Sequence, residues 1–139
     1  MTERLDTLAR LCQQFDVDIL YVFGSRAIEV REWFTNLRAE LLKPLSDVDV
    51  GVKIARSFSV QEKVHLALAL EDLLGAARVD LVSLADADPF LAANIVRGER
   101  LYARDSYWAD EYDLYVLRRA GDLAPLERER QALILGERS

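Results

Sequence analysis

The chain is poor in the residues on which several common kinds of functional site depend. Among its 139 residues there is one cysteine, Cys12, and one histidine, His65. A single cysteine excludes an internal disulfide, and the two counts together exclude cysteine- or histidine-rich zinc sites and a histidine-based nucleophile. Cys12 lies near Leu11 and Phe15 on a predicted helix face, so we expect a buried structural thiol. We expect His65 to be a packed or surface residue of a helix rich in leucine and alanine.

Long apolar runs and basic clusters are also missing. No stretch approaches the roughly 20 apolar residues of a membrane span, and the charged segment 1–12 does not resemble a signal peptide. The 18 Lys and Arg residues against 24 Asp and Glu residues give a net charge of −6. No basic stripe of the kind found in nucleic-acid-binding proteins is visible. We therefore expect a soluble cytoplasmic protein with no direct nucleic-acid or membrane partner.

The apolar pattern predicts one small domain with a C-terminal extension. It predicts helices over residues 2–15, 26–42, 59–74, 88–98 and from 106, and strands over 18–23, 47–54, 77–83 and 100–103. The alternation of the two predicts an α/β (α+β) fold, with a small mixed sheet flanked by helices. We assign 1–105 to the domain and 106–139 to the helical extension. We expect Gly121 to interrupt the last helix, and a short amphipathic helix to form over 126–139 within the charged segment 122–139.

Acidic residues on two predicted strands are the strongest functional signal. Asp47 and Asp49 alternate with valines, so both carboxylates leave the same face of a strand. Two like charges this close repel each other unless a cation lies between them, and Mg²⁺ prefers oxygen ligands. Asp80 lies in the next apolar strand, where a metal or an arginine such as Arg78 must compensate its charge. The alternative is a solvated strand face without a metal.

A Gly-Ser pair at the end of the first predicted strand offers a site for phosphate. Gly24 lets a ligand approach the backbone closely, and the N–H groups at the start of the following helix suit phosphate oxygens. Ser25 can present its own N–H and hydroxyl to a phosphate or can cap the helix. For Arg26, a phosphate contact and a structural salt bridge are both open. Together with the acidic strands, this pattern points to phosphoryl or nucleotidyl transfer.

Three segments carry a resemblance to a known family: Phe23-Gly24-Ser25-Arg26-Ala27, Ser46-Asp47-Val48-Asp49-Val50 and Val79-Asp80-Leu81-Val82. They resemble the polymerase-beta-like nucleotidyltransferases, and within them the minimal nucleotidyltransferases that include MntA-type antitoxins. The resemblance implies that Gly24 and Ser25 hold the triphosphate. It further implies that Asp47, Asp49 and Asp80 form the catalytic metal site, with two Mg²⁺ ions expected and Asp80 helping to deprotonate the acceptor hydroxyl.

The MntA-type resemblance also implies a partner and a reaction. Such antitoxins pair with HEPN-domain ribonuclease toxins and transfer AMP from ATP onto a tyrosine of the toxin, so we expect a hetero-oligomer with a toxin. Two alternatives stay open: transfer of a nucleotide to a small molecule such as an aminoglycoside, and a binding-only antitoxin with a degenerate site. Two aromatic stripes are candidates for either core or partner surface: Trp33/Phe34/Leu37/Leu41 and Trp108/Tyr112/Tyr115.

The chain departs from the pattern of this family between the Gly-Ser pair and the paired aspartates. Residues 26–46 intervene where the usual spacing is shorter, and we interpret residues 27–44 as a helical insertion. The Arg-Gly pair that commonly follows Gly-Ser-Arg-Ala is replaced by Ile28-Glu29. The insertion removes no catalytic group, so it bears on the acceptor and the partner surface more than on the chemistry.

Overall fold

The computed structural model describes residues 2–35 and 47–136. Along the chain the elements are α1 (Glu3–Gln14), β1 (Val17–Phe23), α2 (Ala27–Phe34), β2 (Asp47–Ile54), α3 (Val60–Leu74), β3 (Arg78–Ser83), α4 (Pro89–Val96), β4 (Glu99–Ala103) and α5 (Ser106–Ile134). The strands form one sheet in the order β3-β2-β1-β4. β1 is antiparallel to β2 and β4, whereas β2 and β3 are parallel, which confirms the predicted mixed sheet.

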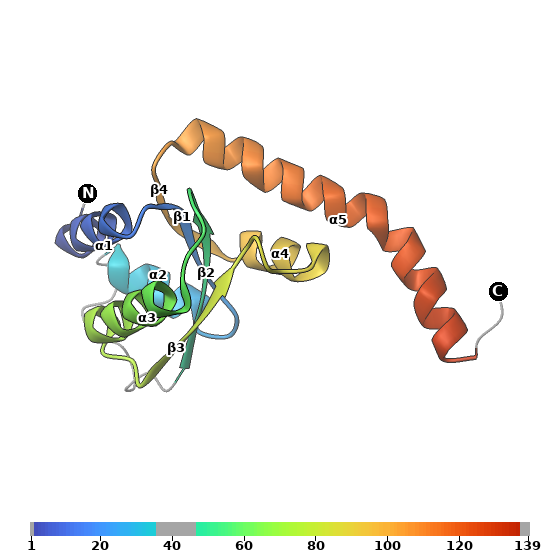
Figure 1. Cartoon of the computed structure of the whole chain (residues 1–139), viewed down its shortest axis with the longest axis horizontal. Coiled ribbons are helices and arrows are strands. Elements are labelled where there is room, and N and C mark those ends of the chain that lie inside the picture. The colour runs from blue at the N-terminus through green and yellow to red at the C-terminus, as the bar shows by residue number, and fades with distance from the viewer. Residues whose placement is uncertain (1, 36–46, 137–139) are drawn as a thin grey trace.

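Helices cover both faces of the sheet (Figure 1). On one face α1, α2 and α3 pack against the even-numbered valines of β2 to form the larger core. On the other face α4 and α5 pack against β1 through a smaller cluster around Ile19, Tyr21 and Ile95. The odd-numbered residues of β2, which include Asp47 and Asp49, therefore belong to the face that α4 and α5 cover, since side chains alternate along a strand.

Local sequence signals place the helix ends as predicted. Ser59 and Glu62 form the capping box of α3, with the Glu62 N–H donating to the Ser59 hydroxyl at 3.1 Å. The helix ends at Gly75, whose φ of 67° is in the left-handed region. Asp88 caps α4 directly before Pro89. The Ser59 and Asp88 caps satisfy N–H groups that have no partner within the helix, and Gly75 satisfies the Glu71 carbonyl, so these residues fix where α3 and α4 begin and where α3 ends.

The two residues that the composition made conspicuous are structural. Cys12 is fully buried in the larger core, and burial raises the pKa of its thiol to about 12, so it stays protonated and unreactive. His65 is an exposed residue of α3. Of the first aromatic stripe, Phe34 is buried in the core and Trp33 packs against it. Leu37 and Leu41 lie outside the described residues, as does the second half of the insertion predicted over 27–44.

The C-terminal helix is longer than predicted. α5 runs without interruption through Gly121 and Pro125, so the predicted break at Gly121 and the separate short helix over 126–139 are wrong. Nothing lies near the site where a Gly121 side chain would be, and its flanking residues include the strong helix formers alanine, leucine and arginine. The helix bends in its C-terminal half (Figure 1), as expected for an internal proline. None of the helices in the described residues is long and apolar enough to cross a membrane.

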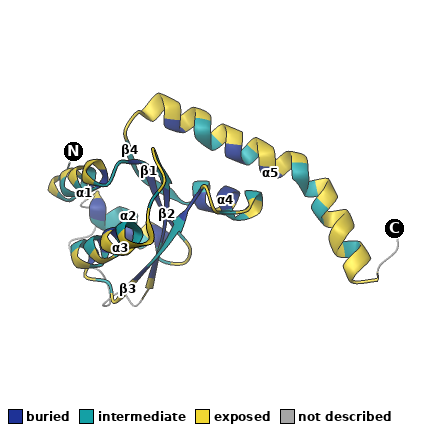
Figure 2. Cartoon of the chain, in the orientation of Figure 1, coloured by how far each residue is buried: buried dark blue, intermediate teal, exposed yellow. Residues whose placement is uncertain are grey.

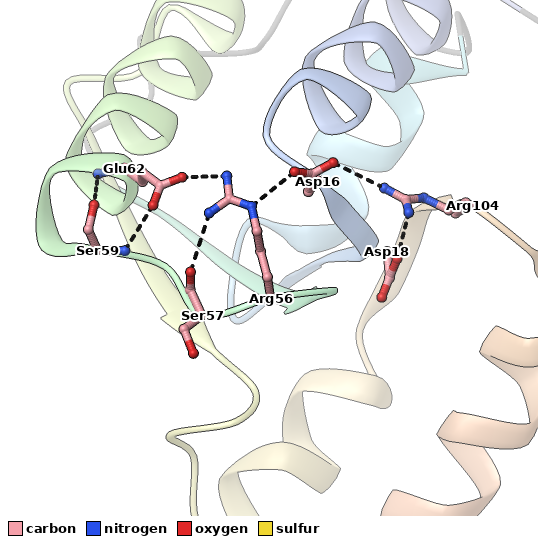
Figure 3. A network of polar contacts seen from close by, with 7 residues as sticks. All are labelled: Asp16, Asp18, Arg56, Ser57, Ser59, Glu62 and Arg104. Carbon is pink, nitrogen blue, oxygen red and sulfur yellow. Dashed lines mark hydrogen bonds and ion pairs between the residues drawn. The ribbon is translucent and has the colours of Figure 1, made fainter.

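A chain of ion pairs joins the elements at the end of the sheet opposite Asp47 (Figure 3). Arg56, which follows β2, contacts Asp16 at 3.0 Å and Glu62 at 2.5 Å. Arg104, which follows β4, lies 3.8 Å from Asp16 and 3.5 Å from Asp18. Because these pairs lie at the surface, water screens their charges and each contributes little to stability. The cluster serves to align the strand ends and takes no part in the acidic site.

Candidate active site

Three carboxylates lie at the same end of the neighbouring strands β2 and β3. Asp49 in β2 is paired in register with Asp80 in β3. Asp47, two residues before Asp49, leaves the same face of β2. Asp49 and Asp80, 31 positions apart in the sequence, are thus neighbours because β2 and β3 run parallel around the crossover helix α3. The structure therefore places all three predicted acidic site residues in one cluster.

The charges of this cluster act on one another. Partial burial raises the pKa of Asp49, and the neighbouring charges of Asp80 and Asp47 raise that pKa further. Arg78, the register partner of Asp47, contacts Asp80 at 2.9 Å. The arginine considered above as a compensating charge for Asp80 is therefore in place. Asp49 has no such partner among the described residues, so its carboxylate is the one that would gain most from a bound cation.

The donor set suits a hard divalent cation, because Mg²⁺ prefers carboxylate oxygens. Within residues 2–35 and 47–136, however, no group of three or more His, Cys, Asp or Glu side chains is gathered closely enough to hold a metal ion. In this arrangement the third carboxylate, Asp80, is engaged by Arg78. The assignment of Asp47, Asp49 and Asp80 as metal ligands stays a prediction.

The turn after β1 lies directly against this cluster. Phe23, the last residue of β1, is the register partner of Asp49 on the side opposite Asp80. Gly24 follows with a φ of 82°, and a Cβ at this position would lie 2.5 Å from Asp49 Oδ2. Both the left-handed backbone and the close carboxylate exclude a side chain here. Gly24 is thus the residue that lets the turn predicted to bind phosphate approach the acidic strand.

The helix that follows this turn begins without a side-chain cap. The N-cap of α2 is Arg26, which makes no capping hydrogen bond with its side chain. Ser25 is exposed and precedes the cap, so it is not the helix cap that the sequence allowed. First-turn N–H groups without a side-chain cap are suited to phosphate oxygens. Arg26 donates from Nε to Glu29 at 2.7 Å, so the structural salt bridge is present, while its contact with phosphate stays a prediction.

A cavity of about 330 Å³ opens beside Gly24 and includes residues that the sequence analysis missed. It is lined by the end of β1, the start of α2 and the C-terminal end of α4: Phe23, Gly24, Ala27, Ile28, Asn94, Arg97, Gly98 and Glu99. The α4 end reaches the site because Gly98 packs tightly on β1, where an added Cβ would lie 2.4 Å from the Val22 carbonyl oxygen. No motif marks Asn94 or Arg97, so only tertiary packing reveals them.

Comparison with known families agrees with this geometry. Residues 6–107 match the family described as polymerase beta, nucleotidyltransferase. The chain belongs to this family. Every predicted site residue of the nucleotidyltransferase, from Gly24 to Asp80, lies inside the matched range. Among curated proteins, none matches the sequence.

Solved structures with the same fold come from toxin–antitoxin complexes. One is a toxin–antitoxin complex with AMP-PNP (TM-score 0.65, 22% identity, 94% of each chain covered). Another is a tri-AMPylated HEPN toxin with its MNT antitoxin from Shewanella oneidensis (TM-score 0.62, 22% identity, 94% of this chain and 92% of that one). A third is an MntA–HepT complex (TM-score 0.62, 21% identity, 94% and 93%). At these identities the likeness establishes the fold of the nucleotidyltransferase, including α5, over nearly its whole length.

Proposed function

We propose that this nucleotidyltransferase is an antitoxin that transfers AMP from ATP to a tyrosine hydroxyl of a HEPN-domain toxin. The observation that carries the proposal is the register of Asp47, Asp49 and Asp80 beside the Gly24 turn. A phosphate-binding turn directly against a carboxylate cluster is what nucleotidyl transfer needs. The similarity in fold to antitoxins that include an AMPylated complex supports the toxin as acceptor.

In the proposed reaction the tyrosine oxygen attacks the α-phosphorus of ATP in line with the leaving group. The new bond joins the tyrosine oxygen to phosphorus, the bond to the β-phosphate oxygen breaks, and pyrophosphate leaves. Gly24, Ser25 and the start of α2 hold the triphosphate, and Asp80 accepts the tyrosine proton. Asp47, Asp49 and Asp80 would together hold Mg²⁺, and the ion would neutralise the charge of the phosphates. The contribution of the chain is mainly positioning, which agrees with the lack of a nucleophile.

The toxin-binding surface in this proposal is α5. The helix is held to the domain by Ala109, Val116 and Ala120, and most of its remaining residues are exposed (Figure 2). Large apolar side chains are prominent among them: Tyr107, Trp108, Leu114, Tyr115, Leu126, Leu133 and Ile134. Exposed apolar area of this kind is typical of an interaction surface. Trp108 and Tyr115, from the second aromatic stripe, are 41% and 55% exposed, which favours the interface interpretation over the core.

The proposal is tested by incubating the purified chain with its candidate toxin, ATP and Mg²⁺ and measuring the intact mass of the toxin. We expect a gain of one or more AMP units on the toxin. The Asp47→Ala/Asp49→Ala variant should bind the toxin and transfer nothing. A complex that forms without any mass gain would point to a binding-only antitoxin, and AMP transfer to an aminoglycoside in place of the toxin would refute the protein acceptor.

A further inference from the structure

The cavity beside Gly24 contains a positive charge that no described residue neutralises. Its two charged lining residues are Arg97 and Glu99. Glu99 is already paired with Arg31, whose Nη1 lies 3.3 Å from its carboxylate. Arg97 is exposed and forms no ion pair or hydrogen bond through its side chain with any residue in 2–35 or 47–136. In a chain with a net charge of −6, an arginine left without a carboxylate partner in a cavity is available to an anion.

The other residues around the phosphate-binding turn do not supply a free cation. Arg26 is held by Glu29 at 2.7 Å. Ile28 lines the cavity and is 58% exposed, but it carries no charge or hydrogen-bonding group. Ser25 and the start of α2 offer neutral donors only. A nucleotide triphosphate bears several negative charges, so a cationic side chain beside these donors would strengthen its binding in addition to the proposed Mg²⁺.

The position of Arg97 is set by tight backbone packing. It lies at the C-cap of α4, immediately before Gly98. A Cβ on Gly98 would lie 2.9 Å from Phe23 Cβ, so the turn after α4 sits directly on the end of β1. Asn94 lies three residues before Arg97, on the same side of α4, and lines the same cavity. The fold thus presents a guanidinium and a carboxamide to the turn that holds Gly24.

We propose that Arg97 binds the triphosphate of the nucleotide at the Gly24 turn, with Asn94 as a neutral donor beside it. This inference rests on the proposed function and adds a nucleotide-contacting residue to it. The guanidinium presents paired N–H donors that match phosphate oxygens. The phosphates would thereby lie between α2 and the end of α4, with the α-phosphate toward Asp49.

The test measures the affinity of the full-length chain for AMP-PNP and for AMP by calorimetry with Mg²⁺ present. We expect Arg97→Ala to weaken AMP-PNP binding by about tenfold or more, the size of one lost charge-assisted hydrogen bond, and to leave AMP binding nearly unchanged. Arg97→Lys should restore part of the loss. The matched control is Arg118→Ala, which removes an exposed arginine of α5 and should change neither affinity.

Three results would overturn the inference. In the first, Arg97→Ala binds AMP-PNP as tightly as Arg118→Ala does. In the second, Arg97→Ala loses affinity for AMP and AMP-PNP equally, which would place the side chain away from the outer phosphates. In the third, Arg97→Ala lowers the unfolding temperature without changing nucleotide affinity, as expected if Arg97 serves only the α4 C-terminus. Failure of the wild-type chain to bind AMP-PNP would instead refute the proposed function.

Discussion

Replacing Gly24 with alanine tests how the phosphate-binding turn and the acidic strand fit together. The φ of Gly24 is 82°, and a left-handed backbone costs a non-glycine residue about 1–2 kcal/mol. The new Cβ would also lie 2.5 Å from Asp49 Oδ2. An ordinary contact begins near 3.4 Å, so the carboxylate or the turn must move by 3.4 − 2.5 = 0.9 Å. Gly24→Ala therefore combines backbone strain with a displaced site carboxylate.

The two effects should appear in different measurements. Backbone strain should lower the unfolding temperature by roughly 3–8 °C in a domain of this size. Moving a catalytic group by about 1 Å costs on the order of 100-fold in rate. We therefore expect Gly24→Ala to reduce the rate of AMP transfer to the toxin by about 100-fold while the chain stays folded. Transfer is followed by intact mass over time, and unfolding by circular dichroism.

Gly75 provides the matched control. It also has a left-handed backbone, with a φ of 67°, but nothing lies within 4 Å of the position that its Cβ would take. It ends α3 on the face opposite the acidic side chains. Gly75→Ala should therefore show a similar loss of stability and an unchanged transfer rate. If both variants transfer AMP equally fast, the close approach of Gly24 to Asp49 is irrelevant to activity and the argument fails.

Three further predictions concern the cluster and its supports. Asp49→Asn should abolish transfer but raise the melting temperature in EDTA at pH 7, because the raised pKa of Asp49 means that the folded state disfavours its ionised form. The difference in melting temperature from the wild-type chain should vanish below about pH 4, where Asp49 is protonated in both the folded and the unfolded state. Equal melting temperatures at pH 7 would refute this. Gly51→Ala should lower the free energy of unfolding measured in urea by about 1–3 kcal/mol, because its Cβ would meet Ile95 Cγ2 at 2.4 Å. The Gly51→Ala/Ile95→Ala double variant should lose less stability than the sum of the two single effects. Tyr21→Phe removes a hydrogen bond to Asp113 of α5 and should lower the free energy of unfolding by about 1–3 kcal/mol. Hydrogen exchange should speed up more in α5 than in α1, and equal changes in the two helices would contradict an anchoring role.

Local patterns were sufficient for most of the elements and failed where a helix contains residues of low propensity. The alternation of β2 and the capping box at Ser59 depend on neighbours in the chain, and both were predicted correctly. Gly121 was wrongly predicted to end a helix, because its cost of about 1 kcal/mol was weighed without the long run of helical hydrogen bonds on both sides. Propensity sets a local cost, whereas the continuity of α5 depends on the whole helix and its packing.

For the candidate site, too, some features follow from local sequence and others only from the tertiary structure. By itself the sequence determined the acidic residues, the Gly-Ser turn and the family, since spacing along one strand decides which side chains share a face. Only the tertiary structure decided that Asp80 is the register partner of Asp49, that Arg26 is held by Glu29, and that Arg97 reaches the cavity beside Gly24. The Arg26–Glu29 pair is local, three residues apart, and the structure chose it over other partners that the sequence left open. The contacts of Asp80 and Arg97 join segments distant in the chain, so they depend on strand order and helix packing, which no local pattern encodes.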